Sequence, residues 1–582
     1  MSRAATILAL VLGPTLGCGG PAPATQAQLV FVVQPADARS GAAIAVQVAV
    51  ADAAGRRPSS PATVSIALAA NPTGATLSGT TSVDAVNGVA SFADLSLDKA
   101  GSGYTLIAFV PPLPPVTSGA FAISSGAPVA LAFTTQPTDS RGTAVTPAVQ
   151  VTLRDAAGNL AANANGSVSL QLVPQPNGAA AVGTMAAKLV DGVATFADLR
   201  FDRPGQDYKL IASTSLTSAT ATSNEFDVQL GPFAAIRPAS SQTWATLSGG
   251  GSYSWGRPVG GFGGSGAGDN DIPVLISSGP DFVSVSGGYI AACGLTAAGA
   301  AYCWGINLDG EVGDGTITQR DVPTAVAGGL TFASLTLGSY YACGLTASGA
   351  AYCWGDNSSG NLGDGTTTRR TSPVPVSGAL TFSSLNAGHT HACGVTPGGA
   401  GYCWGYSLGV GDGTFTDRSA PAAVAGGLTF ASIVAGAYHS CGLTTAGAAY
   451  CWGDNNRGEL GAGFASAGSG ESSPIAVAGG LTFASITAAS GSHTCALTSA
   501  GAAYCWGQND RGQLGVGDLT DRDAPTPVAG GIVFKSVAAG SGPHTCGLTA
   551  AGAAYCWGAD ESGELGDGAM IDSPVPRPVV TQ

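Results

Sequence analysis

Cysteine pairs with a constant spacing constrain this chain more than any other feature. Six times between residues 293 and 556, a cysteine is followed after nine intervening residues by a second cysteine in a Tyr-Cys-Trp-Gly stretch. A seventh copy comes first and carries Trp244 and Ser254 at the two cysteine positions. The C-terminal part of the chain therefore consists of seven copies of one unit. The six pairs are Cys293 with Cys303, Cys343 with Cys353, Cys393 with Cys403, Cys441 with Cys451, Cys495 with Cys505, and Cys546 with Cys556.

Each cysteine pair flanks a sequence that predicts a β-hairpin. In the copy that starts at Cys293, a short extended stretch enters a three-residue loop ending in Gly299, and a second stretch leaves it. Counting back from the loop places Cys293 opposite Cys303. Opposed residues of antiparallel strands have Cα atoms about 4.5–5.5 Å apart, which a disulfide accepts. We therefore expect one disulfide within each of the six hairpins. The alternative, a zinc site, usually needs only about two to four residues between paired ligands.

The spacing of the units predicts a β-propeller. Successive first cysteines are 50, 50, 48, 54 and 51 residues apart. A phenylalanine stands 11 or 12 residues before each of them, and a Pro-x-x-Val stretch before two of these phenylalanines adds a further extended segment. Each unit thus offers about four short strands, the content of a propeller blade, so we expect seven blades. The phenylalanines are Phe233, Phe282, Phe332, Phe382, Phe430, Phe483 and Phe534.

The two ends of the repeat region suggest how the ring closes. No Pro-x-x-Val segment of the repeat precedes Phe233, whereas residues 574–580 form such a segment with no phenylalanine strand after it. We therefore expect residues 574–580 to complete the first blade. The propeller would then be closed by its C-terminal strand and would have no open sheet edge.

On these residues the repeats resemble the RCC1 (regulator of chromosome condensation) family of seven-bladed propellers. The matching pieces are Cys-Gly-Leu-Thr, Tyr-Cys-Trp-Gly and a Gly-x-Leu-Gly-x-Gly loop, as in residues 360–365 and 563–568. The resemblance extends from Phe233 to Val580 and implies a fold more than a function. It implies two functions: guanine-nucleotide exchange or regulation, as for the family's namesake, and enzyme inhibition, as for the secreted propeller β-lactamase inhibitory protein II.

The N-terminus has the features of a bacterial lipoprotein signal. A short basic start and an apolar run over residues 4–12, too short to span a membrane, precede Cys18. We expect a signal peptide over residues 1–17, and a lipidated Cys18 with a tether over residues 18–28. Cysteine arithmetic supports this, because 12 of the 13 cysteines are paired. The alternative is cleavage after Ala27 and secretion.

These features predict a location in the bacterial cell envelope, as an outer-membrane lipoprotein or at the cell surface. Disulfides also form outside the cytoplasm.

Two related units lie between the tether and the repeats. Their alternating strands and Asp/Gly turns predict two immunoglobulin-like sandwiches, over residues 29–125 and 126–230. Tyr104 and Tyr208 suit a tyrosine corner, with ordinary core tyrosines as the alternative. The stretches shared by the two units are 29–35 with 131–137, 52–55 with 155–158, and 88–95 with 192–199.

The charge of the repeat region argues against a nucleic-acid partner. The chain has a net charge of −14, and residues 233–582 contain 23 acidic and 11 basic residues. An acidic propeller repels phosphate backbones, so we expect it not to bind nucleic acid.

The residues two positions before the first cysteines are candidates for a binding cluster. Symmetry would place them at one height near the ring axis, where they would face the channel. The alternative is that each hydrogen-bonds a neighbouring blade. The candidates are Tyr341, His391, His439, His493 and His544.

The repeated Asp-Gly loops present a similar choice between calcium binding and tight turns. Each loop supplies one carboxylate, far short of the six to eight oxygens that calcium takes, so turns are favoured.

No enzyme motif is visible, such as Gly-x-Ser-x-Gly, His-Glu-x-x-His or a phosphate loop. We therefore predict no catalytic residues, no cofactor and no metal. The sequence predicts an all-β, monomeric, non-enzymatic lipoprotein whose two sandwiches carry a disulfide-braced propeller. One face of that propeller would bind a protein or a polysaccharide, and the lipid would be its only link to a membrane.

Overall fold

The structure, a computed structural model, is almost entirely β-sheet, which confirms the predicted all-β class. It describes residues 27–581 apart from 53–55, 58–61, 143, 175–177, 259–268, 277–278, 467 and 469. The signal peptide, Cys18 and nearly all of the tether lie outside the described residues. Within the described part, no helix is both long and apolar enough to cross a membrane.

The first N-terminal unit is a sandwich of two sheets. One sheet has the strand order β1-β3-β7-β5, and the other has the order β2-β10-β8-β4-β6 with β9 beside β8. Alternate residues of the strands, such as Val46, Val48, Leu106 and Ala108, fill the core between the sheets. The strands are β1 (Gln28–Val33), β2 (Ala38–Arg39), β3 (Ile44–Ala51), β4 (Thr63–Ala70), β5 (Leu77–Ser78), β6 (Ser82–Asp84), β7 (Val89–Leu97), β8 (Gly101–Phe109), β9 (Val116–Thr117) and β10 (Phe121–Ser124).

The second unit repeats this plan. Its larger sheets have the orders β11-β12-β16 and β15-β13-β18-β19, with β20 beside β18, and β14 pairs with β17. Val151, Leu153, Leu170 and Leu210 lie in its core. The strands are β11 (Pro128–Thr135), β12 (Val149–Asp155), β13 (Ser167–Val173), β14 (Ala181–Val182), β15 (Ala186–Lys188), β16 (Val193–Phe196), β17 (Arg200–Phe201), β18 (Gly205–Thr214), β19 (Thr217–Thr222) and β20 (Phe226–Val228).

Tyr104 and Tyr208 occupy equivalent places at the start of β8 and β18, and both are fully buried. The Tyr104 hydroxyl donates to the carbonyl of Lys99 at 2.8 Å, and the Tyr208 hydroxyl donates to that of Pro204 at 3.5 Å. A bond to the backbone a few residues upstream is the contact that a tyrosine corner makes.

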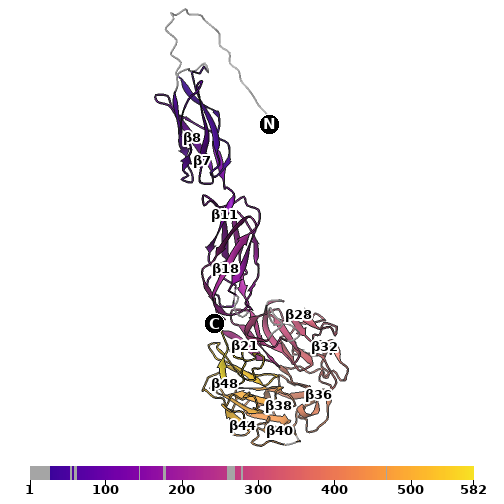
Figure 1. Ribbon diagram of the computed structural model, residues 1–582. Coiled ribbons are helices and arrows are strands. Elements are labelled where there is room, and N and C mark those ends of the chain that lie inside the picture. The colour runs from indigo at the N-terminus through magenta and orange to yellow at the C-terminus, as the bar shows by residue number, and fades with distance from the viewer. Residues whose placement is uncertain are drawn as a thin grey trace, which may run out of the picture.

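The two sandwiches lie end to end and lead to the edge of the propeller (Figure 1). At the first junction, the Asp155 carboxylate accepts hydrogen bonds from the Ser40 hydroxyl (2.7 Å) and the Gly126 N–H (2.8 Å). At the second junction, the Leu275 N–H donates to the carbonyl of Asp202, and the Leu230 N–H donates to that of Thr581, both at 2.8 Å. The C-terminus therefore lies where the second sandwich meets the propeller.

The propeller has the seven predicted blades. Each is a four-stranded antiparallel sheet built from consecutive strands, and the first strand of each lies nearest the axis. The first three blades are β21 (Phe233–Pro238), β22 (Gln242–Leu247), β23 (Ser252–Gly256), β24 (Asn270–Leu275); β25 (Phe282–Gly287), β26 (Ala291–Thr296), β27 (Ala301–Gly305), β28 (Arg320–Ala325); and β29 (Ser334–Leu337), β30 (Tyr341–Leu345), β31 (Ala351–Gly355), β32 (Arg370–Pro375).

The remaining four blades continue in the same order. They are β33 (Ser384–Ala387), β34 (His391–Val395), β35 (Gly401–Gly405), β36 (Arg418–Ala423); β37 (Phe430–Ala435), β38 (His439–Thr444), β39 (Ala449–Gly453), β40 (Glu471–Ala476); β41 (Ser485–Ala488), β42 (His493–Leu497), β43 (Ala503–Gly507), β44 (Arg522–Pro527); and β45 (Ser536–Ala539), β46 (His544–Leu548), β47 (Ala554–Gly558), β48 (Ser573–Pro578). A short 3-10 helix, η2 (Ser407–Gly409), follows β35.

All six predicted disulfides are present. Each joins directly opposed residues of the second and third strands of its blade. Their Cα atoms are 4.0–4.1 Å apart, so the hairpin register read from the sequence is confirmed. The bonds join Cys293 to Cys303, Cys343 to Cys353, Cys393 to Cys403, Cys441 to Cys451, Cys495 to Cys505, and Cys546 to Cys556.

The predicted closure of the ring by residues 574–580 is wrong. These residues lie in β48, which pairs with β47 in the seventh blade. The first blade is complete without them, because residues after its degenerate hairpin form β24 and pair with β23. A blade therefore runs from its phenylalanine strand to its proline strand, and no strand is exchanged between the two ends of the chain.

The ring is closed instead by an interlock of side chains that recurs at five other joints. The indole N–H of Trp255 in blade one donates to the carbonyl of Glu564 in blade seven at 2.9 Å. That indole packs on Gly566, where an added Cβ would lie 2.6 Å from the indole nitrogen. Five further indoles bind the preceding blade in this way at 2.9–3.1 Å: Trp354, Trp404, Trp452, Trp506 and Trp557.

Three of these interlocks contain a buried carboxyl group. Glu311, Glu459 and Glu564 each accept the indole bond with their backbone carbonyl, while a carboxylate oxygen accepts a backbone N–H two residues earlier. Burial raises the pKa of each of the three to about 7. Gln513 holds the same position in blade six and accepts the same backbone bond.

We expect Trp255→Ala to open the joint between blades seven and one. Truncating a large buried aromatic costs about 3–5 kcal/mol of the free energy of unfolding. The matched variant Trp404→Ala loses the same contacts, but blades three and four remain linked by the chain. Hydrogen exchange measured by mass spectrometry should therefore increase in β21 and β46 for Trp255→Ala alone. Equal protection of these strands in both variants would contradict closure through this interlock.

Replacing the three buried glutamates by glutamine should stabilise the propeller at high pH. A carboxyl group whose folded pKa is raised contributes its full stability below its unfolded pKa of 4.5, and loses it as pH rises through 7. The loss is at most about 3 kcal/mol per residue. The melting temperatures of E311Q/E459Q/E564Q and the parent protein should coincide at pH 4, and the variant should melt higher at pH 8. A difference that does not change with pH would argue against titration of these groups.

Candidate functional site

The proposed channel-facing cluster does not face the channel. The four histidines and Tyr341 are buried in the second strand of their blades, one layer outside the inner strands. Each histidine Nε2 bonds a hydroxyl of the next blade at 2.7–3.0 Å, and the Tyr341 hydroxyl donates to the carbonyl of His391 at 2.5 Å. The alternative, contact with the neighbouring blade, is therefore the observed one. The histidines and their partners are His391 with Ser440, His439 with Thr494, His493 with Thr545, and His544 with Thr243.

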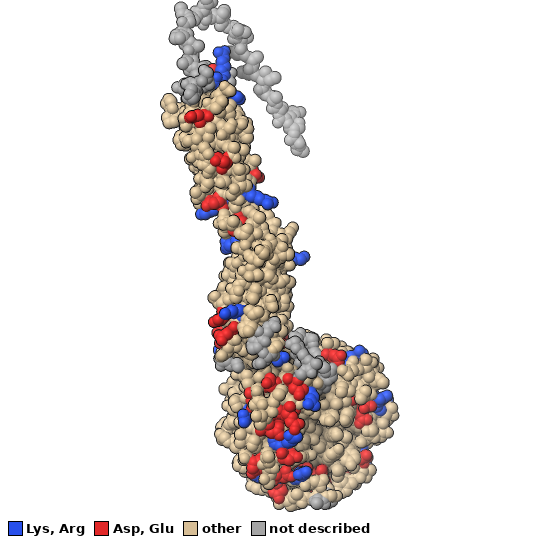
Figure 2. Space-filling model, in the orientation of Figure 1, with Lys and Arg blue, Asp and Glu red and all other residues tan. Residues whose placement is uncertain are grey.

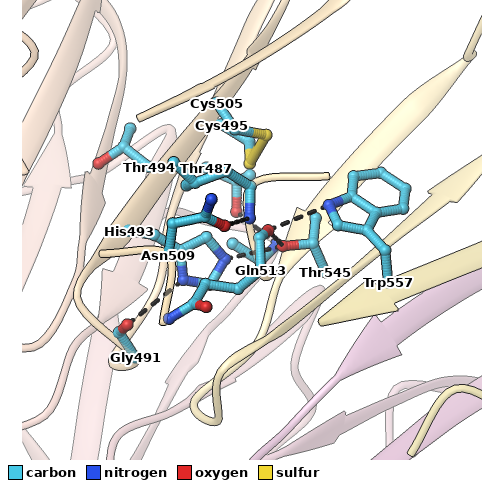
Figure 3. Close-up of a disulfide and its surroundings, with 12 residues drawn as sticks. Thr487, Gly491, His493, Thr494, Cys495, Cys505, Asn509, Gln513, Thr545 and Trp557 are labelled. Atoms are coloured by element: carbon cyan, nitrogen blue, oxygen red, sulfur yellow. Dashed lines mark hydrogen bonds between the residues drawn. A yellow bond between two sulfur atoms is a disulfide. The ribbon is translucent and has the colours of Figure 1, made fainter. Parts of the chain in front are cut away.

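These histidines belong to the interlock. In Figure 3, the Thr545 hydroxyl and the Trp557 indole of blade seven both donate to the carbonyl of Gln513 in blade six, and His493 of blade six bonds Thr545. The other ring nitrogen of His493, Nδ1, lies 3.4 Å from the carbonyl oxygen of Gly491. Burial lowers the pKa of His493 to about 4, so the ring is neutral near pH 7. The cluster is structural.

The Asp-Gly loops form turns fixed by ion pairs. Asp314 accepts the N–H and the hydroxyl of Thr316, and Arg320 pairs with its other carboxylate oxygen. Partial burial opposes ionisation of Asp314, but the hydrogen bonds from Thr316 and Arg320 hold its pKa below the usual value. The same pattern occurs in the loops of Asp364 and Asp412. No group of three or more potential metal ligands occurs among the described residues.

An aromatic arc lies at one mouth of the channel, and we define it as Tyr289, Tyr340, His389, Tyr438 and Tyr406. The first four lie in the turns between the first and second strands of blades two to five, and Tyr406 follows β35. Successive ring centroids are 5.6–6.3 Å apart. Tyr289 is 49% exposed and Tyr438 is 38% exposed. The arc is thus a continuous row of rings, open to solvent, across four blades.

The arc is confined to part of the ring. At the same turn positions, blades one, six and seven carry small residues or proline: Ser240, Ser241, Gly491, Ser492, Gly542 and Pro543. The residues that recur in every blade do not reveal this feature, because the arc consists of residues that differ from blade to blade.

Exposed apolar side chains also occupy the loops between the third and fourth strands. We call Ile317, Phe415, Phe464, Leu519 and Met570 the apolar crown; their exposed fractions are 42–56%. Within a blade, the turn after the first strand and the loop after the third lie at the same end of the sheet, as the pairing of Ala291 with Gly305 shows. The arc and the crown therefore share one face of the propeller.

Most contacts with the second sandwich lie at the other end of the blades, although Arg203 donates to Asn270, at the start of β24, at 3.2 Å. Arg200 of that sandwich lies 3.8 Å from Asp281, directly before the start of β25, and Gly142 accepts a hydrogen bond from Tyr253 at the β22–β23 hairpin end. Tyr289 follows the other end of β25. The arc is thus presented away from the stalk formed by the two sandwiches.

Acidic side chains gather in patches on the propeller, with arginines between them, as Figure 2 shows. Several of these arginines pair with carboxylates of a neighbouring blade, as Arg369 does with Asp309 at 3.2 Å and Arg457 with Asp521 at 3.0 Å. Because acidic residues outnumber basic ones in this region, the propeller as a whole remains negative.

Comparisons with known proteins match the propeller. Human probable E3 ubiquitin-protein ligase HERC3 is 35% identical over 127 residues, which is 22% of this chain and 12% of that protein. The Arabidopsis thaliana ultraviolet-B receptor UVR8 is 41% identical over 92 residues, which is 16% of this chain and 21% of the receptor. The matches thus span about a fifth or less of these relatives.

The crystal structure of Prp20p from Saccharomyces cerevisiae has the same propeller fold. Its TM-score is 0.50 at 22% identity, and the alignment covers 60% of this chain and 87% of that one. Prp20p was characterised together with its binding properties to Gsp1p and histones.

The sequence profile of the RCC1-like domain matches residues 223–582, well over half of the chain. With seven blades, the Tyr-Cys-Trp-Gly hairpins and the glycine loops that hold the indoles, the chain belongs to the RCC1-like domain family.

Proposed function

We propose that this protein is a non-enzymatic binding protein of the bacterial cell envelope, which uses the aromatic arc and the apolar crown to bind a partner protein. The exposed arc is the observation that carries the proposal. Solvent-exposed tyrosines held in a row have no evident structural role, whereas tyrosine is enriched among the residues that dominate protein interfaces.

The geometry of the face supports a macromolecular partner. The crown places apolar side chains around the rim, and the arc lies further inward, so the apolar groups are spread over a broad surface. Exposed apolar residues that gather on one face mark interaction sites in soluble proteins. A polysaccharide, whose sugar rings stack on aromatic side chains, is the second candidate ligand for the arc.

The net negative charge of the propeller favours some classes of partner over others. The propeller is acidic, so a partner with a basic surface would be drawn to it, and nucleic acid would be repelled. The stalk supports the same role, because the first sandwich, with β7 and β8, lies at the end of the stalk remote from the propeller (Figure 1).

A photo-crosslinking amino acid in place of Tyr289 should capture the partner in intact cells. The matched control is the same substitution at Phe109, an exposed aromatic residue of the first sandwich. A protein captured from position 289 and not from position 109 supports the proposal, and a captured glycan would favour the polysaccharide. Equal capture from both positions would contradict a role for this face.

The double variant Tyr289→Ala/Tyr438→Ala should bind the captured partner at least about tenfold more weakly, because truncating each interface tyrosine costs about 1 kcal/mol or more. Phe109→Ala should bind normally. Isothermal titration calorimetry with purified proteins measures both affinities, and an unchanged affinity of the double variant would exclude the arc from the interface.

The identity of the captured partner separates the other functions implied by the family resemblance. A small GTPase would favour nucleotide exchange or regulation. An enzyme that loses activity on binding would favour an inhibitor that resembles β-lactamase inhibitory protein II.

We also propose that Cys18 carries a lipid that anchors the stalk, in the outer membrane or at the cell surface; secretion after cleavage at Ala27 is the alternative. This proposal rests on the sequence around Cys18. Cys18→Ala should move the protein from the detergent phase to the aqueous phase in a partitioning experiment, because the lipid supplies the affinity for the membrane. Thr25→Ala in the tether is the control and should stay in the detergent phase. A Cys18→Ala protein that still enters the detergent phase would rule out this anchor.

A further inference from the structure

The inner strands of all seven blades surround a central channel with a volume of about 360 Å³. The register places one residue of each inner strand opposite the first cysteine of its blade, or opposite Trp244 in blade one. These residues form a ring at one level of the channel wall. Its polar members are Arg237, Ser286, Thr336, Asn386 and Thr487, and the other two blades contribute a valine and an alanine.

The oxygen atoms of three ring residues are already used as acceptors. Thr336 Oγ1 accepts the N–H of Ala387 at 3.0 Å, and Asn386 Oδ1 accepts that of Ala435 at 2.8 Å. Thr487 Oγ1 accepts the N–H of Ala539 at 3.3 Å. Each bond ties an inner strand to the next blade. Besides a second lone pair on each oxygen, these side chains still offer hydrogen-bond donors to the channel: the two hydroxyl protons and the amide group.

Arg237 adds a positive charge to this ring. Its Nη1 donates to the carbonyl of Ile236 at 3.3 Å, which leaves most of its five N–H donors unused. Arg237 is an exposed residue at the end of β21, and it forms no ion pair with a carboxylate among the described residues. None of the described residues that line the channel is an aspartate or a glutamate. The free N–H donors of this unpaired cation are therefore available to an anion that enters the channel.

We infer that the channel binds a small carboxylate at the level of Arg237, with the guanidinium as the main contact and the donors of Thr336, Asn386 and Thr487 on the surrounding wall. A planar guanidinium matches a carboxylate through two parallel hydrogen bonds. The guanidinium charge together with the donors on the wall favours an anion over a cation. This inference does not depend on the proposed partner of the aromatic arc.

Malonate is a suitable probe, titrated by isothermal calorimetry into the complete protein at constant ionic strength set with chloride. We expect saturable binding of one malonate per chain. Arg237→Gln should weaken it at least tenfold, because the charge is lost while the side chain remains polar. Lys535→Gln is the control: it removes one positive charge from an exposed site outside the channel and should bind as the parent protein does.

Asn386→Asp tests the wall separately. The substitution keeps the oxygen that accepts the Ala435 N–H and replaces the amide donor by a second carboxylate oxygen, so the joint should persist while an anion is repelled. Malonate binding should fall at least tenfold with an unchanged melting temperature. If Asn386→Asp does not fold, Arg237→Gln alone decides. Absence of saturable binding by the parent protein at millimolar malonate, or equal affinity in Arg237→Gln, would overturn the inference.

Discussion

The propeller depends on an indole N–H that six of the seven blades donate to a backbone carbonyl in the loop of the preceding blade. This bond requires a glycine beside the carbonyl, because the indole occupies the space that a Cβ would take. At Gly313, Gly363 and Gly566, for example, φ is 66–74° and an added Cβ would lie 2.6 Å from the indole nitrogen. The glycine thus serves both the turn of its own loop and the packing of the next blade. Since the same bond joins blade seven to blade one, the ring closes without a shared strand.

The rest of the joint follows from this bond. In four joints the carbonyl that accepts the indole also accepts a hydroxyl of the next blade, and that hydroxyl is hydrogen-bonded to a buried histidine. Such a network fixes the orientation of the histidine ring and uses the polar groups at the joint. The disulfides act within blades, so they brace the hairpin that carries the indole but do not hold the blades together.

Residues that break the sevenfold repeat lie where a ligand can reach them. The arc occupies turns that can vary because the joint below them is formed by other residues. Arg237 likewise stands in a ring whose other members are small or neutral. A repeated scaffold therefore leaves a few positions per blade unconstrained, and function is expected at those positions. The two sandwiches form an extended stalk beside the propeller. Hydrogen bonds such as that of Ser40 to Asp155 fix the orientation of one sandwich relative to the other.

Local pattern and spacing in the sequence determined the all-β class, the seven blades and every disulfide, because a hairpin register depends only on residues close in the chain. Spacing alone did not determine where a blade begins, since a four-strand repeat can be divided at any strand; the pairing of β48 with β47 decided it. Nor did symmetry reveal the direction in which the histidine side chains point, because that depends on partners far away in the sequence. Ser440 lies 49 residues from His391, and Thr243 lies 301 residues from His544. The aromatic arc was decided by tertiary structure for the same reason: its rings come from separate blades, and only the closed ring brings them side by side.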